Sequence, residues 1–339
     1  LRKQLAGAFG IPEEQVRVIV SDTGTGFGGK HGPEVMLEAA RLAKAAGKPV
    51  RVAWSREEEF VCSYCRPAGV IEVCSGLDET SRIVAWDFHN YNSGAASLAA
   101  PYVIPNYWCG YHRAESPLRQ GAYRSLAAVA NAFARETHVE ELAALAEQDP
   151  VAFRLRNLEE PRMREVVERA AERFGWGARR GAMGMACNLE KDGRLALFVE
   201  VEANRETVNV RRMVGAFDFG AVLNPENLRS QVTGALIMGI GGALFEELRY
   251  DRRRVLNNRL RQYRVPRFSD VPEIEVILVD RREITPAGAG ESPITVVAPA
   301  INAALFAATG KRLRELPLEK GLPAAQAGVD ASDARMRAS

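Results

Sequence analysis

The sequence predicts an α+β protein in which two α/β lobes are separated by a helical stretch. Three patterns carry this prediction. The N-terminal residues alternate strand, glycine-rich loop, helix and strand, and the alanine-rich residues 126–147 then form a long helix. Beyond that helix the chain returns to a β-hairpin, a glycine-containing helix and a further strand. With 339 residues, the chain has the length for two domains, each with its own core.

We expect the first lobe over residues 1–175, with a helical segment at 126–175. Proline at a first helical position and glycine just past the last one mark several of its helices. Its predicted elements are, in order, an amphipathic N-terminal helix, a strand at 15–21, a helix at 33–46, a strand at 50–54, short strands at 69–76 and 82–91, and helices at 126–147, 150–158 and 161–175.

We expect the second lobe over residues 176–318 and a frayed tail, rich in Ala, Asp, Arg and Ser, over 319–339. The lobe opens with two segments that look like the strands of a hairpin. Its predicted elements are strands at 195–203 and 207–217 with a turn at 204–206, a helix at 225–247, a strand at 273–279, and a helix at 299–309 that stops at Gly310.

The composition is that of an ordinary globular protein. Hydrophobic residues make up 47% of the chain and charged residues 26%, which argues against wholesale disorder. The 45 Lys and Arg residues nearly balance the 43 Asp and Glu residues, so the charge indicates neither nucleic acid nor an anionic membrane as a partner. The apolar stretch 236–245 is about half as long as a bilayer-spanning helix, and we expect no membrane span.

We expect the N-terminus to be a cut through a larger protein. The chain opens on Leu1 and enters an amphipathic helix, without the regions of a secretory signal. Any targeting signal would lie upstream, so the compartment stays open, with the cytoplasm slightly favoured over the periplasm.

The five cysteines are too few and too irregularly spaced for a disulfide framework. Cys62 and Cys65 form one CxxC, but no second pair stands at metal-site spacing. Incidental thiols are therefore the favoured interpretation, with metal or redox work as the alternative. The four histidines are scattered, and we predict no metal-ligating side chains in this chain.

The loop DTGTGFGGKH matches two phosphate-binding patterns incompletely. Gly24, Gly26 and Gly29 satisfy GxGxxG, and Gly24, Gly29 and Lys30 satisfy a Walker A loop except that His31 replaces Ser or Thr. Glycines let backbone N–H groups approach an anion, and the following helix adds its positive end. The alternatives are a cofactor loop, a nucleotide-binding loop in an α/β protein, and a tight structural turn.

Four separated blocks stand out along the chain. They are GTGFGGK at 24–30, the arginine segment and helix at 118–143 with the following DPVAFRLRNL, the segment from DFGAVLNPENL at 218–247, and PAGAGESP with its helix at 286–318. Together they resemble the molybdopterin-binding large subunits of the xanthine dehydrogenase/aldehyde oxidase family, the molybdenum hydroxylases. They are most similar to subunits of the nicotinate dehydrogenase and isoquinoline 1-oxidoreductase type. The resemblance extends over most of residues 10–318 and corresponds to the C-terminal part of such a subunit, with its N-terminal portion missing.

The resemblance implies cofactor-binding roles in both lobes. Gly26, Phe27 and Gly28 would line the molybdenum centre, and Arg124 would bring its guanidinium close to the pterin. Gln231 would hydrogen-bond the cofactor from the second lobe. Taken alone, Arg124 could be a helix-start arginine that reaches water, and Gln231 a polar position on a helix face.

The resemblance also implies that Glu291, in GAGESP, is the catalytic base. A carboxylate beside the attacking water-derived oxygen can take its proton. Gly290 would bind the cofactor and, lacking a Cβ, would let the loop of Glu291 approach it. The local sequence by itself also allows an exposed acid on a Gly-Pro turn.

The implied activity is hydroxylation of a carbon of an N-heteroaromatic or aldehyde substrate with water-derived oxygen. The implied cofactor is molybdopterin, with the cytosine dinucleotide form as one option, and iron–sulfur clusters would lie in a partner small subunit. A flavin or cytochrome subunit is a further candidate partner. His31 stands where purine-oxidising relatives carry a substrate-binding glutamate, which argues against xanthine. The alternative is an inactive fragment or assembly module, because the family's other cofactor segments are absent.

Overall fold

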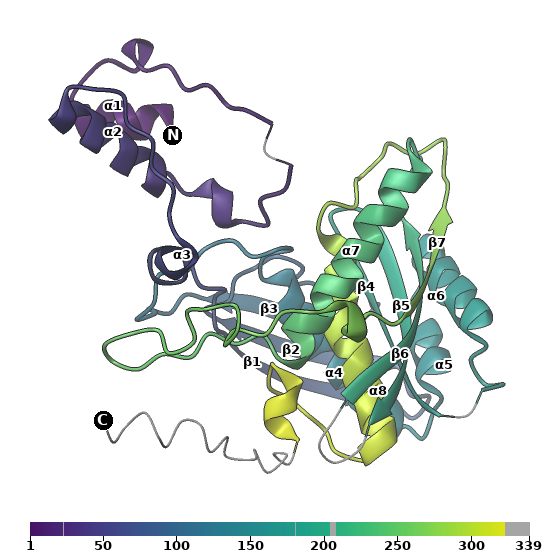
Figure 1. Cartoon of the computed structure of the whole chain (residues 1–339). Coiled ribbons are helices and arrows are strands. Elements are labelled where there is room, and N and C mark those ends of the chain that lie inside the picture. The colour runs from purple at the N-terminus through teal and green to yellow at the C-terminus, as the bar shows by residue number, and fades with distance from the viewer. Residues whose placement is uncertain (23, 180, 204–207, 323–339) are drawn as a thin grey trace, which may run out of the picture.

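The computed structural model describes residues 1–22, 24–179, 181–203 and 208–322. A large body contains the two sheets and most helices, and the N-terminal segment with α1 and α2 stands apart from it (Figure 1). The helices are α1 Arg2–Phe9, α2 Glu34–Ala46, α3 Arg56–Cys62, α4 Ala128–Leu145, α5 Pro150–Asn157, α6 Pro161–Phe174, α7 Pro225–Leu244 and α8 Val297–Thr309. The strands are β1 Val70–Leu77, β2 Ile83–Tyr91, β3 Asn106–His112, β4 Ala182–Glu190, β5 Gly193–Ala203, β6 Val208–Asp218 and β7 Glu273–Val279.

The two strands predicted in the N-terminal segment are not formed. Residues 16–22 and 50–54 run without regular structure, and the side chains of Ile19 and Val20 are 78% and 79% exposed. A strand requires a hydrogen-bonded neighbour, and the described residues supply none for either stretch. The predicted helix at 33–46 is confirmed as α2, which ends at Gly47.

The central helices are confirmed with their predicted caps. Asp149 caps α5 by accepting hydrogen bonds from the backbone N–H groups of Val151 and Ala152, with Pro150 as the first helical residue. The helix α6 ends at Gly175, which adopts the left-handed conformation. Such caps depend only on neighbouring residues, which is why the sequence predicted them.

A four-stranded sheet in the order β4-β5-β6-β7 forms the centre of the large body. The strands β4, β5 and β6 are antiparallel, while β7 is parallel to β6 and is reached through α7. The predicted hairpin is confirmed as β5 and β6, and its predicted turn at 204–206 lies outside the described residues. The strands β3 and β4 were not predicted.

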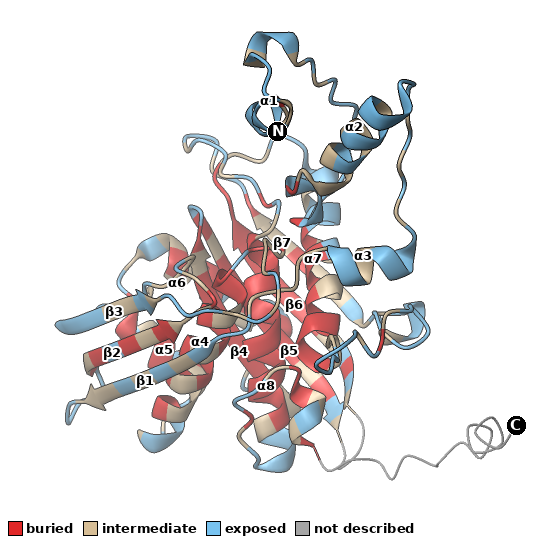
Figure 2. Cartoon of the chain, turned by 90° about the vertical axis from the view of Figure 1, so that its left-hand side faces the viewer, coloured by how far each residue is buried: buried red, intermediate tan, exposed pale blue. Residues whose placement is uncertain are grey.

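Helices cover both faces of this sheet. The helix α8 packs on β4 and β5, and α6 packs on β5 and β6 from the other side. Buried residues concentrate in these strands and in α7 and α8, whereas the N-terminal segment is mostly exposed (Figure 2). One cluster of core residues joins β2, the helices α4 to α6 and the sheet, so the core runs across residue 175, where we predict the lobe boundary.

The stretch Ser292–Thr309 is long and apolar enough, by length and composition alone, to cross a membrane. In this fold 78% of it is buried, because it forms a short 3₁₀ turn, Ser292–Val296, and the core helix α8. A helix that is apolar all round is typical of a protein core as well as of a membrane.

The first residues of the predicted tail at 319–339 are folded. Residues Leu318–Gly321 form a 3₁₀ turn, and Leu318 and Leu322 are buried in the core of the large body. Burial of these two leucines explains why the turn is folded. The rest of the predicted tail, 323–339, lies outside the described residues.

Candidate active site

Arg124, just ahead of α4, joins three segments that are distant in the sequence. Its side chain is buried, with 3% of the residue exposed. The guanidinium donates from Nε and Nη2 to the carbonyl oxygen of Gly290 at 3.1 and 2.9 Å, and from Nη2 to the carbonyl oxygen of Gln231 at 3.4 Å. It also lies over the ring of Phe27, 4.7 Å from the ring centroid. Burial lowers the pKa of Arg124, and these carbonyl contacts offset the cost of burying its charge.

The loop containing Gly26, Phe27 and Gly28 is pressed against the segment that carries Arg124. Phe27 and Gly28 have φ angles of 46° and 102°, in the region that favours glycine. A Cβ added to Gly28 would lie 1.9 Å from the carbonyl oxygen of Ala122. Only glycine fits this position, so the loop reaches the site through a close backbone approach.

The phosphate-loop interpretation loses its structural basis. It requires a strand before Gly24 and a helix directly after the glycines. Residues 16–22 form no strand, and the glycines run into the 3₁₀ turn Gly29–His31 rather than into a helix. The glycine loop therefore lies beside Arg124 and does not follow a strand of a sheet.

Glu291 comes directly before the 3₁₀ turn that leads into α8. Its Oε2 accepts a hydrogen bond from the backbone N–H of Ser125 at 2.7 Å. Its Oε1 forms an ion pair with Nζ of Lys191, and its side chain is 29% exposed. The carboxylate is thus held on both oxygens, which differs from a freely solvated acid on a turn.

Lys191 was missed by the sequence analysis. It lies in the turn between β4 and β5, and β4 was not predicted, so no pattern placed this turn near Glu291. Two other predicted residues contribute backbone only. Gln231, on α7, is exposed and meets Arg124 through its carbonyl oxygen, and a Cβ added to Gly290 would meet nothing within 4 Å.

A second polar group adjoins Tyr123, the residue before Arg124, and was also missed. The guanidinium of Arg66 lies over the ring of Tyr123 at 5.0 Å, and the hydroxyl of Tyr263 is 3.5 Å from Oε2 of Glu246. Burial raises the pKa of Glu246 to about 7, and Arg66 opposes this only in part. The hydroxyl of Tyr123 is buried without a hydrogen-bond partner among the described residues.

The residues around Glu291 fit a polar, anionic cofactor. The hydroxyl of Ser125 is fully buried and has no hydrogen-bond partner among the described residues, so it has a bond left to make. The space in front of Gly290 is open, and Phe27 is partly exposed beside a buried guanidinium. Within the described ranges, no group of three or more His, Cys, Asp or Glu side chains is placed to hold a metal ion directly.

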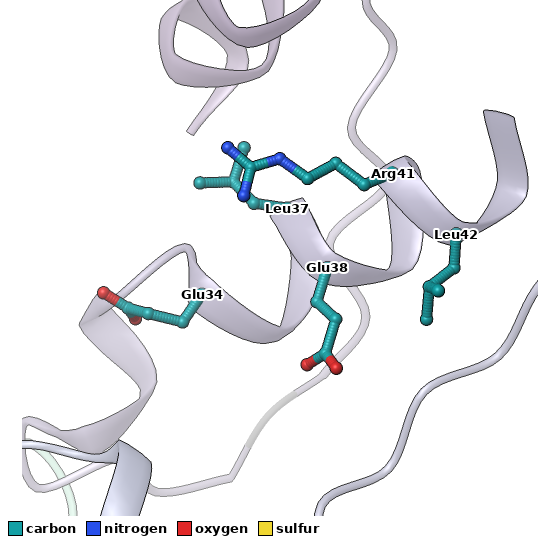
Figure 3. A pocket seen from close by; sticks show the side chains of 5 residues that line it. All are labelled: Glu34, Leu37, Glu38, Arg41 and Leu42. Atoms are coloured by element: carbon teal, nitrogen blue, oxygen red, sulfur yellow. The ribbon is translucent and has the colours of Figure 1, made fainter. Parts of the chain in front are cut away.

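Several cavities of the described residues lie outside this group, one of them, of about 490 Å³, along the strands β1, β2 and β3. Another, of about 380 Å³, is lined by a single helix, α2, through Glu34, Leu37, Glu38, Arg41 and Leu42, whose side chains point to different sides (Figure 3). A larger one, of about 770 Å³, lies between β1, α4 and residues 314–320. None of these three is lined by Arg124 or Glu291.

Comparison with known proteins identifies relatives over almost the whole chain. Two models of a molybdopterin cofactor-binding domain match residues 1–158 and 121–272. A subunit of nicotinate dehydrogenase from Pseudomonas putida is 30% identical over 94% of this chain and 31% of that protein. The beta subunit of isoquinoline 1-oxidoreductase from Brevundimonas diminuta is 29% identical over 94% of this chain and 44% of that protein. The chain thus spans less than half the length of these two curated relatives.

Solved structures share the fold. Quinoline 2-oxidoreductase from Pseudomonas putida 86 superposes with a TM-score of 0.80 at 16% identity, over 95% of this chain and 71% of that one. Aldehyde oxidoreductase from Desulfovibrio gigas superposes with a TM-score of 0.81 at 15% identity, over 94% of this chain and 55% of that one. These similarities confirm the predicted fold class.

Proposed function

Because the chain belongs to the molybdopterin cofactor-binding family of the molybdenum hydroxylases, we propose that it forms the catalytic part of such an oxidoreductase. The enzyme would hydroxylate a carbon of an N-heteroaromatic or aldehyde substrate with oxygen derived from water. Relatives named for nicotinate, isoquinoline, quinoline and aldehydes support this substrate class.

A single observation carries the proposal. The side chain of Arg124 contacts the glycine loop, α7 and the loop before α8. Its hydrogen-bond acceptor in the last of these is the carbonyl oxygen of Gly290, the residue before Glu291. Convergence of segments this distant in the sequence is typical of a site assembled for one ligand.

The same residues are those that would hold the cofactor. We expect the backbone of Gly26 to Gly28 and the guanidinium of Arg124 to face its polar groups, with Gln231 and Gly290 closing the far side. The Ser125 hydroxyl, which lacks a partner among the described residues, would donate to it. When bound, the cofactor supplies the two-electron oxidation of the substrate carbon.

Glu291 would act as the base. Its Oε2 is anchored by the backbone N–H of Ser125, and Oε1, which contacts Nζ of Lys191, would exchange that contact for the proton of the attacking oxygen. A fixed carboxylate transfers a proton faster than a freely rotating one, because its position is set before the reaction. The Ser125 contact supports the orientation that a general base requires.

The same proposal includes partner subunits and a particular chemical form of the cofactor. Both curated relatives are named as subunits, which supports assembly with other chains. We expect a small iron–sulfur subunit to take up the electrons, with a flavin or cytochrome subunit as a further member, and the cytosine dinucleotide form as one form of the cofactor. The proposed division at residue 175 concerns the cofactor-binding segments, since the hydrophobic core is continuous across that residue.

Metal analysis and one substitution test the proposal. The purified, active complex should contain molybdenum, and an active complex without it would exclude the proposed chemistry. Glu291→Gln should lower turnover by about 100-fold or more while molybdenum content stays normal, since only proton transfer is removed. Glu283→Gln, an exposed acid in the same region, is the matched control and should leave turnover unchanged.

The assembly-module alternative makes a different prediction. A chain that only supports assembly would leave the complex fully active when Glu291 is replaced, while loss of the whole chain would abolish complex formation. Near-normal turnover of Glu291→Gln with intact assembly would therefore favour it.

A further inference from the structure

The three-stranded sheet of β1, β2 and β3 has one face turned outward. Along β2, Trp86 and Phe88 are buried, whereas Asp87 is exposed and His89 is half-buried. The outer strands β1 and β3 are exposed or half-buried along their whole length (Figure 2). Because successive side chains of a strand point to opposite faces, Asp87 and His89 share the outer face of the sheet.

His89 and His112 meet on this outer face, although 23 positions separate them in the sequence. The strands β2 and β3 are parallel, and their register places His89 opposite Gly110 and Tyr91 opposite His112. The two imidazoles therefore project from diagonal positions, and Nδ1 of His89 lies 2.9 Å from Nε2 of His112. The sequence analysis expected no metal-ligating side chains, because this pairing depends on strand register.

Aromatic rings hold both imidazoles in place. The ring centroid of Trp108 lies 4.4 Å from that of His89, and the ring centroid of Tyr91 lies 4.7 Å from that of His112. Gly110 leaves room for this arrangement, since a Cβ there would lie 2.0 Å from the indole of Trp108. The packed rings therefore fix the two facing nitrogens before any ligand binds.

The carboxylate of Asp87 orients the imidazole of His89. Its Oδ1 lies 3.1 Å from Nε2 of His89. An ionised carboxylate can only accept a hydrogen bond, so in the neutral ring Nε2 carries the hydrogen and Nδ1 presents its lone pair toward His112. Metal-ligating histidines typically make this second contact, because it sets the tautomer and raises the basicity of the ligating nitrogen.

The separation of the two nitrogens fits one coordination geometry. Metal–nitrogen bonds of about 2.0–2.1 Å that meet at a right angle place the nitrogens about 2.9 Å apart, whereas a tetrahedral angle places them about 3.3 Å apart. Right angles belong to the square-planar or tetragonal sites that Cu²⁺ and Ni²⁺ form with nitrogen and oxygen ligands. The observed 2.9 Å therefore matches these two ions.

We propose that Nδ1 of His89 and Nε2 of His112 form a surface site for a divalent transition metal, Cu²⁺ or Ni²⁺. Water completes the coordination, since the side chain of His89 is 30% exposed and the cavity of about 490 Å³ is lined by its neighbours Asp87 and Trp108. Without the ion, Nε2 of His112 donates its hydrogen to Nδ1 of His89. When the ion binds, that hydrogen moves to Nδ1 of His112 and the ring stays neutral. This site is independent of the function proposed for Glu291.

Calorimetric titration of the purified, tag-free chain with Ni²⁺ tests the proposal. Ni²⁺ is the probe because, unlike Cu²⁺, it does not oxidise thiols, and Cys62 and Cys74 are exposed. The affinity should fall by more than about 10-fold in His89→Ala and in His112→Ala, since each variant loses one of the two ligands. Asp87→Asn should lower the affinity by about 10-fold, the low end for such a supporting contact, because this carboxylate is 56% exposed.

The fluorescence of Trp108 provides a second readout. Bound Ni²⁺ should quench this indole, which packs on His89, and the quenching should be lost in Trp108→Phe while binding is retained. Because these side chains lie on the outer face, the variants should keep the melting temperature of the wild type.

His31→Ala removes another exposed histidine and is the matched control, which should bind Ni²⁺ as the wild type does. Wild-type affinity in His89→Ala or in His112→Ala overturns the proposal, as does an equal loss of affinity in His31→Ala. In either case the two imidazoles form a surface hydrogen bond only.

Discussion

The guanidinium of Arg124 donates two hydrogen bonds to the carbonyl oxygen of Gly290, a residue 166 positions away in the sequence. This pair fixes the loop that carries Glu291 against the start of α4. Because one buried side chain also reaches Phe27 and Gln231, the geometry of the candidate site depends on a planar donor with several N–H groups.

Arg124→Lys should therefore damage the site although it keeps the charge. A lysine offers one compact ammonium and cannot make the two hydrogen bonds to Gly290 while covering Phe27. We expect the free energy of unfolding to fall by about 2 kcal/mol, and the molybdenum content of the purified complex to drop. Denaturant unfolding and metal analysis measure the two effects. Arg282→Lys, at an exposed position, should change neither.

Gly28→Ala should separate the glycine loop from the Arg124 segment. The new methyl group would collide with the carbonyl of Ala122, and the φ of 102° is strained for any other residue. We expect a loss of more than about 1 kcal/mol and faster hydrogen exchange over residues 24–31. Gly29→Ala, where a Cβ meets nothing within 4 Å, is the control. Equal exchange in the two variants would contradict the proposed close approach.

Acid should weaken the attachment of α6 to the sheet through Asp218. Burial by itself would raise the pKa of Asp218, but hydrogen bonds from Arg162 and Arg281 and from the N–H of Gly220 lower it to about 2. A carboxylate with a lowered pKa stabilises the fold above its ordinary pKa near 4, and this contribution is lost as pH falls toward 2. The melting temperature of the wild type should fall over this window, and that of Asp218→Asn should fall less.

Glu246 should act in the opposite direction. Burial raises its pKa to about 7, so the folded protein prefers the neutral acid. A raised pKa contributes stability at low pH that is lost as pH rises from about 4.5 to about 7. Glu246→Gln should remove this decline. The difference in melting temperature between the variant and the wild type should therefore shift in favour of the variant between pH 4 and pH 8. Glu247→Gln, which alters a surface ion pair with Lys320, is the control and should keep the decline. Melting temperatures measured between pH 4 and pH 8 distinguish the two variants.

The helices and their limits were largely predictable because their signals are local. Asp149 and Pro150 start α5, Gly175 ends α6 and Gly310 ends α8, each within a few residues of the element concerned. Strands were less predictable. Residues 15–21 have a strand pattern but no neighbour to pair with, while β4, which lacks a clear alternation, forms because β5 and α8 pack on it.

The sequence by itself determined the fold class, most helices and the identity of the residues expected at the site, because glycine loops, caps and the GAGESP segment are written in consecutive residues. Only the tertiary structure decided how these residues meet: the two hydrogen bonds from Arg124 to Gly290, and the ion pair of Lys191 with Glu291. The reason is physical. Contacts between segments a hundred or more residues apart depend on how the sheet and helices pack, and packing is a property of the whole chain rather than of any local pattern.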